Sequence, residues 1–135
     1  MAYSFSTTVD LPFDEAVSRT TDVLQRHGFG VLTQIDVKQT LKKKLDVEFR
    51  PYVILGACNP QMAHQALQAE DKIGLMLPCN VVVQQQKSGE VEISAVDPVA
   101  SMQAIDNPHL GDIANQVRGM LRQVIAEVRH PARAA

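Results

Sequence analysis

Two cysteines carry most of the chemical potential of this 135-residue chain, and an asparagine follows each of them. Cys58-Asn59-Pro60 ends one apolar run, and Pro78-Cys79-Asn80 begins the next. Thiols act as nucleophiles, redox groups and soft metal ligands. Cys58 and Cys79 are therefore the candidate catalytic residues. If their two strands are neighbours, Cys58, Asn59, Cys79 and Asn80 could line one ligand-binding pocket.

Cys58 directly precedes a predicted helix N-terminus, where unpaired N–H groups and the positive end of the helix dipole favour a thiolate. Such a position lowers a thiol pKa from about 8.5 to between about 3.5 and 7.5. This suits a nucleophilic or sulfur-carrying cysteine. Cysteine is also among the most buried residue types, so a core residue at a strand end is the competing interpretation. Cys79 has the same two interpretations: a second functional thiol, either resolving or metal-binding, or a core residue.

His64 lies within the predicted short helix and adds a third soft donor to the two thiols. A structural zinc site takes four ligands, and a catalytic site takes three plus water. The spacing of these three residues matches no standard zinc motif, so we predict no metal site and keep His64 as a ligand-binding candidate. GxSxG, HExxH, P-loop and GxGxxG motifs are absent from the sequence. The sequence therefore assigns neither a reaction nor a cofactor.

Hydrophobic periodicity places these residues between strands and helices. Alternating and continuously apolar runs predict strands at about 3–9, 31–37, 47–58, 81–86 and 91–95. Stripes at helical spacing predict helices at about 12–27, 60–69 and 107–128, the first with Asp10 as N-cap and the other two with Asn-Pro starts. A short helix or helical turn is expected at 38–45, and a helical turn at 100–105.

This order of elements predicts an α+β fold. Strands joined by short connections indicate an antiparallel sheet, and the long helices need one face of it to bury their apolar stripes. We predict a single domain over residues 1–129 and a frayed C-terminal tail over 130–135. The other sheet face must be polar, covered by a partner or used for binding, and a homodimer would cover it most simply.

The composition argues against several classes of partner. The net charge is −2, and the single basic run, Lys42-Lys43-Lys44, is typical of a solvated helix face. We therefore expect no nucleic acid partner. The sequence has no apolar stretch of transmembrane length and no signal-peptide pattern at its start. We expect no membrane association and a cytoplasmic location, where cysteines stay reduced.

Several segments together resemble a prokaryotic family known only as domain of unknown function 302. The most specific are the GACNP piece at 56–60 and the LPCNV piece at 77–81. The others are 13–17, 27–32, 35–37, 52–55 and 73–76. The resemblance implies a β-α-β4-α order similar to one half of the TATA-binding-protein fold, and a homodimer. It implies no established reaction.

Three functional hypotheses follow from these residues. The first is a dimeric ligand-binding or accessory module, whose small-molecule pocket is lined by the two Cys-Asn pairs and His64. The second is a thiol-dependent redox or sulfur-transfer enzyme that uses Cys58. The third is a purely structural partner domain, in which both cysteines serve only packing.

Overall fold

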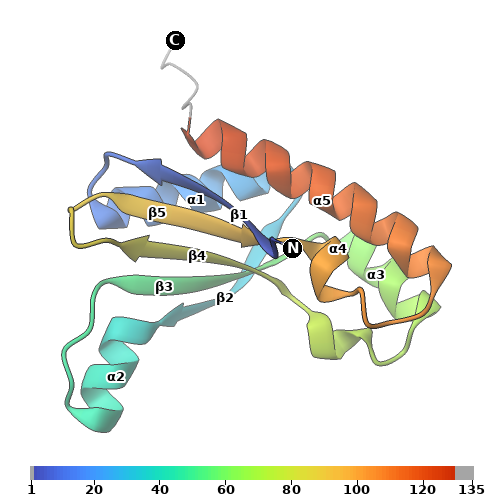
Figure 1. Cartoon of the computed structure of the whole chain (residues 1–135), viewed down its shortest axis with the longest axis horizontal. Helices are drawn as coiled ribbons and strands as arrows, with labels where there is room; N and C mark the ends of the chain where they lie inside the picture. Colours follow the sequence, from blue (N-terminus) through green and yellow to red (C-terminus); the bar gives the residue numbers. More distant parts are fainter. Residues whose placement is uncertain (1, 130–135) are drawn as a thin grey trace.

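A five-stranded antiparallel sheet is the centre of the computed structural model, which describes residues 2–129 (Figure 1). Its strand order is β1-β5-β4-β3-β2. The expected α+β class is confirmed, whereas the predicted tail, 130–135, lies outside the described residues. The strands are β1 Ser4–Val9, β2 Gly30–Asp36, β3 Tyr52–Cys58, β4 Cys79–Gln85 and β5 Val91–Val96.

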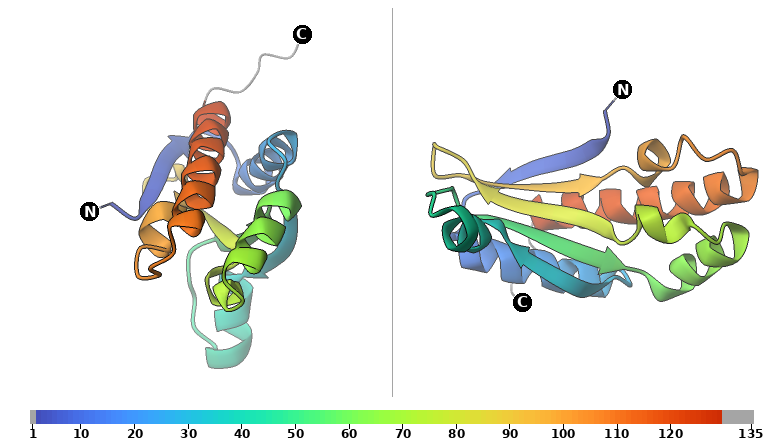
Figure 2. Two further views of the ribbon diagram at one scale, coloured as in Figure 1. Left: turned by 90° about the vertical axis from the view of Figure 1, so that its right-hand side faces the viewer. Right: turned by 90° about the horizontal axis from the view of Figure 1, so that it is seen from below.

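The two long helices, α1 and α5, cover one face of this sheet (Figure 2). Each buries one apolar stripe, as the helical spacing predicted. The stripe of α5 includes Leu110, Val117, Leu121 and Val128. The helices are α1 Phe13–Arg26, α2 Val37–Leu45, α3 Pro60–Ala69, α4 Pro98–Ser101 and α5 Pro108–Arg129, and a short 3-10 helix, η1, spans Ile73–Met76.

Strand alternation separates a buried from an open sheet face. In β5, Val91, Ile93 and Ala95 are fully buried, while the residues between them are half-exposed. The strand register places buried residues beside one another across the sheet, because Ile93 pairs with Val83, and Val83 pairs with Val53. These inward side chains form the core with the stripes of α1 and α5.

Several element boundaries differ from the expected ones. The third strand begins at Tyr52 rather than near 47, because Asp46 ends α2 in a left-handed conformation and 46–51 form no ladder. The fourth strand begins at Cys79, two residues before the expected start. A bulge in β2 between Val31 and Thr33 interrupts its pairing with β3.

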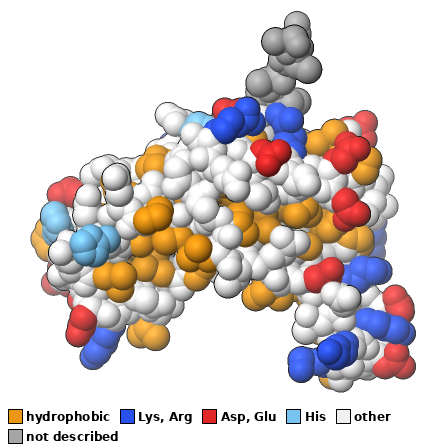
Figure 3. Space-filling view, turned by 180° about the vertical axis from the view of Figure 1, so that it is seen from behind, with side chains coloured by type: hydrophobic (Ala, Val, Ile, Leu, Met, Phe, Trp, Pro, Cys, Tyr) orange, Lys and Arg blue, Asp and Glu red, His pale blue; other side chains and the backbone are white. Residues whose placement is uncertain are grey.

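Helix α2 buries none of its residues and projects from one end of the sheet (Figure 1). Its lysines face water, as expected. Hydrophobic side chains gather instead over the opposite end of the molecule, which holds α3 and η1 (Figure 3). Leu67, Leu75 and Met76 are among the large exposed hydrophobic residues there.

Candidate functional site

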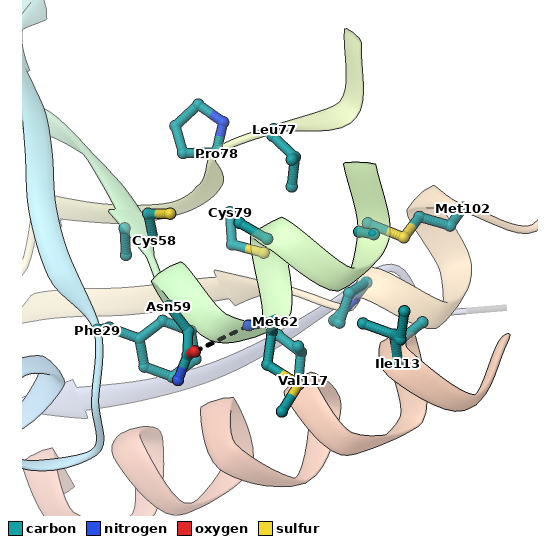
Figure 4. Close-up of a pocket in the computed structure, with 15 residues that line it drawn as sticks. Phe29, Cys58, Asn59, Met62, Leu77, Pro78, Cys79, Met102, Ile113 and Val117 are labelled. Atoms are coloured by element: carbon teal, nitrogen blue, oxygen red, sulfur yellow. Dashed lines mark hydrogen bonds between the residues drawn. The ribbon is translucent and has the colours of Figure 1, made fainter. Parts of the chain in front are cut away.

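The two cysteines meet where β3 ends and β4 begins. Ala57 is the register partner of Cys79, so Cys58 lies one residue beyond the last pair of this ladder. Both thiols are free. Figure 4 shows the Cys58 sulfur directed toward the side on which Cys79 lies. The antiparallel pairing therefore brings together two thiols that are 21 positions apart in the sequence.

Asn59 fixes the turn from β3 into α3. Its backbone is extended, and its side-chain Oδ1 accepts a hydrogen bond from the backbone N–H of Met62 at 3.1 Å (Figure 4). Pro60 then occupies the first helical position, where its missing N–H costs nothing. This is an N-cap formed by Asn and Pro, as the sequence predicted, and it sets where α3 starts relative to Cys58.

Close backbone contacts also surround the site. A Cβ at Gly56 would overlap Thr33 Oγ1 on β2 and Pro78 Cγ beside β4, so only glycine fits between these side chains. Gly28 has a φ of +86°, and a Cβ there would lie 3.1 Å from the Asn59 amide nitrogen. The α1–β2 turn thus lies directly against the start of α3.

An apolar cavity of about 30 Å³ lies between the strand ends, α3 and α5. Cys58, Asn59, Met62, Ala63, Leu77 and Pro78 border it and are half-exposed, so it reaches the surface between α3 and the β4 start. Its deeper walls are buried: Phe29, Ala57, Ala66, Cys79, Pro98, Met102, Ile113, Ala114 and Val117. No Asp, Glu, Lys, Arg or His is among these lining residues.

Burial controls the chemistry of Cys79. Its surroundings are apolar and only 8% of the residue is exposed. Burial, with a smaller contribution from the neighbouring Cys58, raises the pKa of the Cys79 thiol from 9.0 to about 11. Cys79 therefore stays protonated at neutral pH.

The structure brings together some of the predicted site residues and separates others. Cys58, Asn59 and Cys79 line the same cavity. Asn80 does not, because it points to the opposite face of the sheet, where it borders a separate hollow with Tyr52 and Val82. His64 is exposed on α3 and does not line the cavity either.

Sequence reasoning missed the apolar walls of this cavity. Met62, Met102 and Phe29 all line it, and no sequence motif links any of them to the cysteines. They come from α3, the segment after α4 and the α1–β2 turn, and no local motif connects these segments.

Within 2–129, His, Cys, Asp and Glu side chains form no group of three or more suited to a metal ion. In the same range, every helix is too short or too polar to span a bilayer.

Comparisons with known proteins identify the family but no activity. The chain is similar to a crystal structure of an uncharacterized conserved protein DUF302 from Bacillus stearothermophilus, with 31% identity and a TM-score of 0.89. That match covers 96% of this chain and 100% of the other. None of the curated proteins compared with the chain is significantly similar to it. The likeness to half of the TATA-binding-protein fold stays a prediction.

The sequence pattern of the domain of unknown function DUF302 matches residues 5–128, which include both Cys-Asn pairs. This chain therefore belongs to the DUF302 family.

Proposed function

We propose that this chain is a small ligand-binding module whose site is the cavity beside Cys58, Asn59 and Cys79. The observation that carries the proposal is an apolar opening, bordered by a thiol and an amide, beside a core in which Leu24, Leu55 and Leu121 are fully buried. Binding sites are mostly apolar hollows with a few placed polar groups. We place the chain in the cytoplasm, where both thiols stay free.

The volume of the cavity limits the size of the ligand that can bind without a change in the surrounding structure. About 30 Å³ holds one or two water molecules. A larger ligand therefore requires α3 to shift. This helix buries only Ala66 completely, so its displacement exposes little apolar surface. The wall that moves to admit such a ligand would be the helix that Asn59 caps.

Binding without turnover fits the site better than thiol catalysis. A thiol enzyme needs a thiolate and a neighbouring base or cation to activate it. Cys79 is held protonated by burial, and the lining residues include no basic side chain. Cys58 alone remains as a possible nucleophile. A purely structural domain would use both cysteines for packing and leave the cavity empty of ligand.

The proposal is tested by following xenon binding with methyl NMR on the wild type and two variants. Ala63→Leu fills the half-exposed border of the cavity, whereas Gln65→Leu adds the same side chain to an exposed position on the same helix. We expect saturable shifts at Met62, Met102 and Ile113 in the wild type and in Gln65→Leu. Their persistence in Ala63→Leu, or their absence from the wild type, would contradict the proposal.

The open sheet face supports a homodimer as the second part of this proposal. Register aligns Ile35, Ile54, Val82, Ser94 and Ser6 in one row across the sheet. This row lies opposite the face that α1 and α5 cover, and Ile35 is 48% exposed. A second copy would remove its apolar members from water. Light scattering should give twice the chain mass for the wild type and the monomer mass for Val82→Glu; a monomeric wild type would refute the dimer.

A further inference from the structure

Four sulfur-containing side chains line the cavity: Cys58, Met62, Cys79 and Met102. They come from β3, α3, β4 and the residue after α4. In Figure 4 the Cys58 sulfur points toward the side on which Cys79 lies, the Cys79 sulfur points toward α3, Met102 lies on the far side and Met62 extends toward α5. Apart from Asn59, no other lining residue has a side-chain atom that can coordinate a metal. The donor set of the site is therefore soft.

Soft thiolate and thioether ligands select Cu(I), Zn(II) and Fe–S clusters among the metals that proteins bind. Two thiolates in a near-linear arrangement complete the coordination of Cu(I), and Cys58 and Cys79 are the two thiols that line this cavity. We infer that the ligand of this cavity is a single Cu(I) ion, held between the sulfurs of Cys58 and Cys79 and shielded by the thioethers. This inference rests on the proposed binding function and names its ligand.

The coordination number distinguishes Cu(I) from Zn(II). Zinc takes four ligands in structural sites, and three protein ligands plus water in catalytic ones. His64 is exposed on α3, and within residues 2–129 the structure has no cluster of three or more His, Cys, Asp or Glu side chains that could bind a metal. Two thiolates complete the coordination of Cu(I), whereas Zn(II) would still lack two of its four ligands.

The loading step balances without any redox partner. Two S–H bonds break, two Cu–S bonds form, and two protons pass to solvent, while copper and both sulfurs keep their oxidation states. The product carries one negative charge. Cys58 directly precedes the N-cap of α3, so the positive end of a ten-residue helix lies beside that charge. Because protons leave, apparent affinity should rise with pH.

The apolar walls would protect the bound ion. Phe29, Ile113 and Val117 close the deep side of the cavity with apolar surface. Cu(I) in contact with water and oxygen oxidises readily, whereas sulfur ligands and apolar walls that limit solvent access preserve the reduced ion. A module with this property would carry or buffer the ion rather than use it for turnover.

The test is an oxygen-free titration of the full reduced chain with Cu(I) in the presence of bathocuproine disulfonate as competitor. We expect the wild type to retain one Cu(I) per chain and to develop ultraviolet copper–thiolate absorption. Cys58→Ala and Cys79→Ala should each lose both signals. Met120→Leu, which changes a methionine outside the cavity lining, should keep them.

Cys58 is half-exposed, so Cys58→Ala is the variant that should fold even if loss of the buried Cys79 thiol destabilises the chain. Retention of copper by Cys58→Ala, or its complete removal from the wild type by the competitor, would overturn the copper assignment. If the wild type does not retain copper but xenon still binds Gln65→Leu and not Ala63→Leu, the proposed binding function stands and only the copper assignment is wrong. If the wild type binds neither copper nor xenon, both the binding site and its ligand are refuted.

Discussion

Ionisation of Cys79 should destabilise the fold in a defined alkaline range. The folded pKa of this thiol is about 11, against an ordinary value of 9.0. Below about pH 9 the thiol is protonated in both the folded and the unfolded chain, so its contribution to stability is constant. Above that pH the unfolded chain loses the proton first. The free energy of unfolding must then fall until the folded thiol ionises near pH 11.

The size of this effect follows from the two pKa values. Each unit between them corresponds to about 1.4 kcal/mol, so the full loss between pH 9 and pH 11 is about 3 kcal/mol. That is a large fraction of the 5–15 kcal/mol typical of a natural domain. The stabilisation is fully present at neutral pH and lost as pH rises through the folded pKa.

The assay is urea unfolding of the wild type and Cys79→Ala over this alkaline range. All other ionisable side chains are the same in both proteins, so the difference in unfolding free energy isolates Cys79. We expect that difference to be constant below about pH 9 and to change by about 3 kcal/mol by pH 11. Parallel curves for the two proteins would refute the reasoning, because they would show that burial does not hold the proton.

Alkylation provides an independent check on the same thiol. Only the thiolate reacts with iodoacetamide, so at pH 8 a pKa of about 11 rather than 9.0 reduces the reactive fraction about 100-fold. We expect folded Cys79 to react at least that much more slowly than the same residue in urea. Equal rates in the folded and unfolded chain would contradict the burial of this thiol.

Other substitutions test the local geometry through urea unfolding. Asn59→Ala should cost about 1 kcal/mol by removing the cap of α3, whereas Asn59→Asp should keep it; equal losses would argue against the cap. Gly56→Ala should destabilise the fold through the side chains on either side of it, while Gly30→Ala, with nothing near its Cβ, should not. Leu55→Ala should cost about 2–5 kcal/mol because Leu55 is fully buried, and Leu75→Ala almost nothing because Leu75 is 83% exposed.

Local sequence signals predicted the secondary structure well because they depend on neighbouring residues. The start of α3 follows from Asn59 and Pro60 alone, since the cap bond reaches only three residues ahead. The stripe of α5 follows from its own spacing. Helices on one face of an antiparallel sheet then follow, because these stripes need a common apolar surface.

The site was only partly predictable because one strand begins earlier than its apolar run indicated. The expected start at Val81 left Asn80 in a loop, free to approach Asn59. With β4 beginning at Cys79, strand alternation sends Cys79 inward and Asn80 to the opposite face. His64 follows a similar rule: two residues after the inward Met62, it lies almost on the far side of the helix.

The walls of the cavity could not be predicted from local patterns. Phe29, Met102 and Ile113 reach it from segments spread over more than half of the chain. These three side chains come together only through the way α3 and α5 pack against the sheet, and sequence periodicity does not specify that packing. Identifying Cys58 and Cys79 as neighbours required only the pairing of β3 with β4.

Native mass spectrometry of the wild type, Ala63→Leu and Gln65→Leu, purified without chelator or reductant, tests the central claim most directly. Our account predicts a stoichiometric non-covalent adduct on the wild type and on Gln65→Leu, and its loss from Ala63→Leu. An adduct equal to one copper per chain would also identify the ligand. A bare chain mass in all three proteins, or an adduct that survives in Ala63→Leu, would contradict a binding site at Cys58 and Cys79.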